Sequence, residues 1–139
     1  MPRDHMTRDE WLSLAARCQA ATGVDRGIDA AMAEALGLPP AGYQFSEDAV
    51  IWVRRKGTGP IRWSPPTWTG SLDAITALIE RELPSLHWLT GHAGDLRPQK
   101  YTGYIMPPSP SGDIIVTAHT PALALASAFC LAMAESEPT

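Results

Sequence analysis

The sequence has few of the features that mark secreted or membrane proteins. Only two cysteines, Cys18 and Cys130, occur among its 139 residues, and both lie in apolar helical patterns. Small secreted domains rely instead on a dense set of disulfides. No run of about 18 apolar residues is present, so we expect no membrane span. The first residues are charged and contain no apolar core of signal-peptide length, and we therefore expect a cytoplasmic protein.

Catalytic and metal-binding signatures are also missing from the sequence. It contains no Gly-x-Ser-x-Gly element and no lysine at the spacing of a phosphate-binding loop. The spacing of His87, His92, Asp95 and His119 matches no standard zinc pattern. We therefore expect no metal, no cofactor and a role in binding, although a catalytic site assembled from distant residues would leave no local signature.

Strong positive charge is absent overall, but the basic residues are unevenly distributed. The formal net charge is −4, which argues against a duplex-DNA binder. Between Asp48 and Asp73 there is no acidic residue, and without the four positive charges of this window the net charge would be −8. The window contains Arg54, Arg55, Lys56 and Arg62 together with Trp52, Trp63 and Trp68.

Two interpretations of this basic, aromatic window stay open at the level of sequence. Guanidinium groups bind phosphate oxygens and indole rings stack on bases, which suits a nucleotide-like small molecule. The window also fits a solvated hairpin whose tryptophans point into the core. Alternation places Ile51 and Val53 on the face opposite Trp52 and Arg54, which in part supports the solvated hairpin.

Apolar periodicity predicts four helices, and β-forming segments between proline-rich and glycine-rich turns predict strands. The order favours an α+β fold with a small antiparallel or mixed sheet and helices packed on both of its faces, an α-β-α sandwich. We expect a single domain over residues 1–139, with 1–6 and 135–139 frayed. The predicted helices follow caps at Thr7, Ser71 and Thr120, with one further helix that starts at Asp25. The predicted strands span 49–53, 61–63, 86–89, 100–106 and 113–117.

The last predicted helix is apolar on all sides. Thr120 is its expected cap, Pro121 takes the first helical position, and residues 122–134 are almost wholly apolar. Such a helix is either enclosed on both sides or part of an oligomer interface. Because symmetric dimers are the commonest closed assembly, we expect a homodimer or a higher homo-oligomer.

Three segments in the same order resemble the phage ABA-sandwich domain family. Asp25-Arg-Gly-Ile-Asp-Ala30 resembles its "GRELDAxIA" opening, with Ile28 in place of the usual glutamate. Trp68-Thr-Gly-Ser-Leu-Asp-Ala74 resembles "YTASLDAA", and residues 118–126 resemble "ATPALALCxAAL". The segments 50–63 and 91–98 have no match in that pattern. The resemblance implies a phage or prophage protein in a bacterial cytoplasm with an α-β-α sandwich fold, and it implies no established activity.

A ligand site is expected where two predicted helices begin. Hydroxyl groups and free amides at a helix start attract anions, although plain capping is the simpler interpretation of each. The expected function is the sequestration of a phosphate-bearing nucleotide signal of host immunity, without catalysis. The alternative is a protein–protein inhibitor or virion accessory factor with no small-molecule ligand. The expected ligand-binding residues are Arg26, Arg54, Arg55, Arg62, Trp68, Thr69, Ser71, Tyr101, His119 and Thr120.

Overall fold

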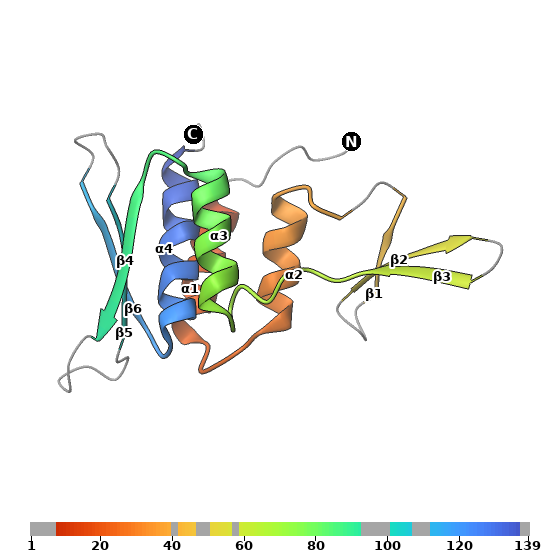
Figure 1. Cartoon of the computed structure of the whole chain (residues 1–139), viewed down its shortest axis with the longest axis horizontal. Helices are drawn as coiled ribbons and strands as arrows, with labels where there is room; N and C mark the ends of the chain where they lie inside the picture. The colour runs from red at the N-terminus through yellow and green to blue at the C-terminus, as the bar shows by residue number, and fades with distance from the viewer. Residues whose placement is uncertain are drawn as a thin grey trace.

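The computed structural model describes residues 8–39, 42–46, 51–56, 59–92, 101–106 and 112–136. Over these residues the chain forms an α+β fold of four helices and two separate antiparallel sheets (Figure 1). The helices are α1 Arg8–Ala20, α2 Arg26–Ala35, α3 Leu72–Glu82 and α4 Pro121–Ser136. The strands are β1 Gln44–Ser46, β2 Ile51–Lys56, β3 Gly59–Trp63, β4 His87–His92, β5 Tyr101–Met106 and β6 Ile114–Ala118.

The α+β class and the four helices agree with the sequence prediction, but the arrangement of the layers differs. The sequence predicted one sheet between helices, whereas the described residues place the helices between two sheets (Figure 1). The strands pair only with neighbours along the chain, in the orders β1-β2-β3 and β4-β5-β6. Short connections favour this local antiparallel pairing. Strand β1 was not predicted, because the three residues Gln44–Ser46 are too few to show an alternating pattern.

Helix α4 occupies the centre of the molecule. It packs against α1, α3 and all three strands of the second sheet. Every residue from Ala122 to Cys130 is buried. Contacts within one chain therefore account for the apolar character of this helix. The homo-oligomer predicted from that character stays a prediction, since burial of this helix does not require a second copy.

The sheet β4-β5-β6 packs one face on the helices and leaves the other uncovered by any described helix or strand (Figure 1). Ile105 and Ile114 are cross-strand partners on the inner face and are buried. On the outer face, Leu89 and Ile115 are 47% and 60% exposed. This alternation follows from the period of two along a strand. No helix in the described residues is both long and apolar enough to cross a bilayer.

The sheet β1-β2-β3 forms a small arm that extends from the side of the helices where α2 lies (Figure 1). We call its described residues, 44–46, 51–56 and 59–63, the β-arm. Strands β2 and β3 pair from Trp52 and Trp63 near the base to Lys56 and Gly59 at the far end. Strand β1 pairs with the base of β2, where Phe45 lies opposite Trp52. The arm therefore has a three-stranded base and a two-stranded tip.

Candidate functional site

Arg26 joins the start of α2 to the loop that precedes α3. Its Nη2 donates to the carbonyl oxygen of Pro65 at 2.7 Å. Its Nη1 lies 2.9 Å from Oδ2 of Asp29 and 3.0 Å from Oγ1 of Thr67, and 3.3 Å from the carbonyl oxygen of Pro66. The guanidinium group is thus occupied by acceptors of the protein itself. Its geometry is that of a tether between two segments about 40 residues apart.

Asp29 and Thr69 complete this junction. Oδ1 of Asp29 accepts from the backbone amide of Thr69 at 2.9 Å, and Oγ1 of Thr69 accepts from the amide of Asp25 at 2.9 Å. Asp29 and Thr69 are both buried. Burial raises the pKa of Asp29 above its ordinary value, against the lowering effects of the hydrogen bonds from Thr69 and the charge of Arg26. The sequence predicted a helix start at Asp25 but gave no signal of this pairing.

The helix-start residues predicted to hold a ligand have structural roles in this fold. Trp68 is only 2% exposed, so its indole has no free face for stacking. Ser71 Oγ accepts from the amide of Ala74 at 3.1 Å, and Thr120 Oγ1 accepts from the amide of Leu123 at 3.1 Å. Helices α3 and α4 begin at the same end of the helix layer (Figure 1). This arrangement is compatible with the predicted ligand site shared by the two helix starts. Its hydroxyl groups, however, act as plain N-caps.

Tyr101 and His119 lie near the end of the second sheet. Tyr101 is half-buried at the start of β5, where its ring meets that of His92 edge to face with 5.6 Å between centroids. His119 is half-buried and directly follows β6. Within the described residues, no group of three or more histidine, cysteine, aspartate or glutamate side chains is placed to hold a metal ion.

An aromatic row crosses the base of the β-arm. Phe45, Trp52 and Trp63 are cross-strand neighbours on one face. The ring centroids of Phe45 and Trp52 lie 4.8 Å apart, and those of Trp52 and Trp63 lie 5.4 Å apart. Trp52 is buried, whereas Phe45 is 45% exposed. The predicted hairpin therefore has one aromatic face, which we call the aromatic face of the arm, and stacking between its rings stabilises the base.

The arginines of the arm lie on both of its faces. Arg54 pairs across the strands with Ile61, two positions beyond Trp52, and therefore shares the aromatic face. Arg62 pairs with Val53 and projects on the opposite face. For Arg55 the structure describes only the backbone, which pairs with Pro60. Arg54 and Arg62 therefore project from opposite faces of the arm, although both lie in the acid-free window.

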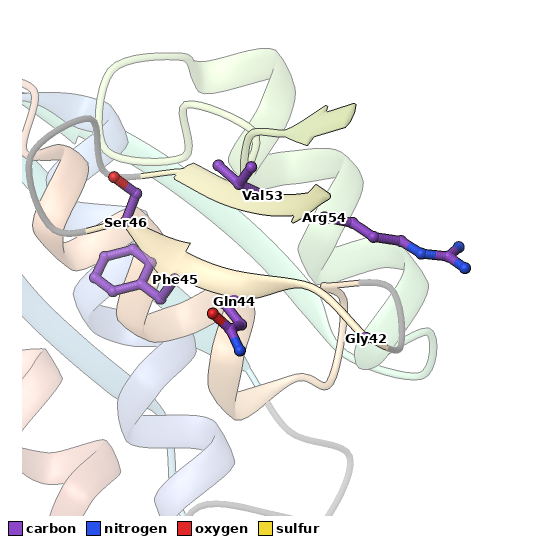
Figure 2. A pocket seen from close by; sticks show the side chains of 6 residues that line it. All are labelled: Gly42, Gln44, Phe45, Ser46, Val53 and Arg54. Carbon is purple, nitrogen blue, oxygen red and sulfur yellow. The ribbon is translucent and has the colours of Figure 1, made fainter. Parts of the chain in front are cut away.

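An open hollow lies beside strands β1 and β2, and residues from both faces of the arm line it. Gln44, Ser46 and Val53 line it together with Gly42, Phe45 and Arg54 (Figure 2). Arg54 is one of the lining residues shown in Figure 2, and its Nε lies 4.0 Å from the position that a Cβ atom on Gly42 would take.

A smaller groove lies on the aromatic face, between the arm and α2. Its cavity of about 120 Å³ is lined by Phe45 and Trp52 on one side and by α2 on the other. Ala30 and Ala31 provide small apolar side chains there, and the exposed Glu34 provides a carboxylate. The groove was not predicted from sequence, because it depends on how the arm is seated against α2.

No protein-family model, no curated protein and no solved structure matches this chain. The resemblance to phage ABA-sandwich proteins therefore stays an expectation drawn from three short segments.

Proposed function

We propose that this chain is a binding protein that contacts a protein partner through the β-arm. The observation that carries the proposal is the arm itself, a projecting sheet with exposed apolar side chains and cations. Phe45 is 45% exposed and Ile61 is 47% exposed, and Arg54 lies beside Ile61 across the strands. Exposed apolar side chains flanked by polar ones are typical of protein contact surfaces.

The charge distribution supports a protein with an acidic contact surface as the partner. Strands β2 and β3 of the arm lie in a window of 24 residues without a carboxylate, between Asp48 and Asp73. Cations on both faces of a narrow sheet attract an extended acidic surface and raise the rate of association. This function corresponds to the inhibitor or accessory role considered from the sequence.

The nucleotide-sequestering role receives less support from the geometry. Arg26 is held by backbone carbonyls and Asp29, and Trp68 and Thr69 are buried. A small phosphate-bearing ligand requires several donors that converge on one cavity. We therefore rank this role below protein binding and include it as an outcome of the test.

The test is photo-crosslinking in the cells that express the chain. A benzophenone amino acid replaces Ile61 on the aromatic face, and in a control it replaces Ile115 on the outer face of the second sheet. We expect position 61 to give protein adducts that the control does not give. In parallel, the purified chain is incubated with a nucleotide mixture, washed and heated. Release of intact nucleotide, with no protein adduct at position 61, would contradict protein binding and support nucleotide sequestration. Release of a chemically altered nucleotide would indicate an enzyme.

A further inference from the structure

The aromatic face of the arm has two different ends. At the base, the groove between the arm and α2 is an apolar hollow with the exposed carboxylate of Glu34 at its lining. Toward the tip, Ile61 projects as an apolar side chain, and its cross-strand partner Arg54 supplies a positive charge. One end of the face therefore has a cavity and an anion, and the other has a protruding side chain and a cation.

From this complementarity we propose that the aromatic face of the arm binds the same face of a second copy of this chain. The two arms lie antiparallel about a twofold axis. Ile61 of each copy then enters the groove of the other, and Arg54 of each copy meets Glu34 of the other. This inference rests on the proposed function, because it names a second copy as a partner of the arm.

The size of the groove supports this occupant. A cavity of roughly 150 Å³ holds a benzene-sized group, so the groove, at about 120 Å³, suits one branched aliphatic side chain. Ile61 is such a side chain and is 47% exposed in the single chain. Insertion would also cover the exposed part of Phe45, which lines the same groove. Removal of this apolar surface from water is the main driving force expected for association.

The charges support the same arrangement. Within the described part of the chain, neither Glu34 nor Arg54 has an ion-pair partner. A twofold axis makes an interface self-complementary, so one pairing of Glu34 with Arg54 occurs twice. We call each of these two Glu34–Arg54 pairings a seam. The two seams flank the apolar contacts, as polar rims do in protein interfaces.

Sedimentation equilibrium of the purified full-length chain at micromolar concentration tests the proposal. We expect a reversible dimer. Arg54→Glu places two carboxylates in each seam and should weaken the dimer by about tenfold or more. The matched control is Arg62→Glu, which makes the same charge change at a neighbouring position on the opposite face and should leave the dimer unchanged. Ile61→Asp should weaken the dimer by about a hundredfold, because it places a carboxylate in an apolar groove.

A mixing experiment tests the reciprocal geometry. Glu34→Arg and Arg54→Glu should each be mainly monomeric, since each variant repels itself in both seams. Mixed together, they should form a heterodimer of near wild-type affinity, because one seam is then native and the other has its charges exchanged. Circular dichroism and thermal melting of each variant verify that the arm and the helices remain folded.

The results separate this inference from the proposed function. A wild-type chain that sediments as a monomer, or equal dimer affinities for Arg54→Glu and Arg62→Glu, would overturn the reciprocal dimer. Protein adducts from a different polypeptide at position 61 would then still support the proposed function. A dimer that obeys the charge rules, together with no adduct to any other protein, would support this inference and confine the arm to self-association.

Discussion

Gly103 of β5 lies directly against the backbone of Ala124 in α4, where a Cβ atom on the glycine would collide with the Ala124 carbonyl group. This contact lets the central helix approach the sheet more closely than any side chain would allow. It also fixes the position along α4 at which the sheet is seated.

Substitution of Gly103 by alanine should therefore destabilise the fold. The added methyl group meets rigid backbone, so helix and sheet must separate locally, at a cost of about 3 kcal/mol in the free energy of unfolding. Gly91→Ala is the control, since its new Cβ would meet only the hydroxyl group of Thr102, at 3.8 Å. We expect the control to change stability by about 0.5 kcal/mol or less in urea denaturation. Equal effects of the two changes would show that the close approach is unimportant.

Loss of Arg26 should affect folding more than ligand binding. Arg26→Ala removes the hydrogen bonds to the carbonyls of Pro65 and Pro66 and leaves the buried Asp29 without its counter-charge. We expect a loss of about 2 kcal/mol, and Arg26→Lys should recover only part of it, because an ammonium group cannot donate along the same two directions. Urea denaturation gives the stabilities, and inorganic phosphate in calorimetry probes the anion site. Unchanged stability with weakened phosphate binding would restore the ligand role predicted from sequence.

Asp29 should make stability depend on pH in an unusual direction for a carboxylate. Because its pKa is raised by burial, the folded state binds the proton more tightly than the unfolded state does. Its contribution is therefore fully present below the ordinary pKa of 3.8 and is lost as the pH rises through the raised folded value. The stability of the wild type relative to Asp29→Asn should accordingly increase as the pH falls from neutrality. A relative decrease on acidification would mean that Arg26 and Thr69 outweigh desolvation.

The two thiols should be unreactive in the folded protein. Cys18 and Cys130 are fully buried, and burial together with contact with Cys18 raises the pKa of the Cys130 thiol well above its usual range. Only the thiolate reacts at an appreciable rate. We expect a chromogenic disulfide reagent to label neither thiol in buffer and both in denaturant, at a rate that follows unfolding. Rapid labelling of one thiol in buffer would show that α1 and α4 separate locally.

The sequence alone determined the elements that depend on neighbouring residues. The helix starts predicted at Asp25, Ser71 and Thr120 each have a side chain that accepts from the amide three positions ahead, a contact within one turn. The apolar composition of residues 122–134 predicted a helix that is either enclosed or part of an oligomer interface, and the fold buries residues 122–130 within one chain. The same local rules predicted the hairpin of β2 and β3, because alternation and a glycine-rich turn specify it.

Only the tertiary structure decided which surfaces these elements share. The tether from Arg26 to Pro65 joins segments 39 residues apart, and no spacing rule connects them. Arg54 and Arg62 lie on opposite faces because of the register between β2 and β3. A shift of this register by one residue would have placed both side chains on the same face. The groove beside Glu34 exists because the arm is seated against α2. Long-range packing fixes these relationships, whereas a sequence pattern specifies only what lies within one element or one turn.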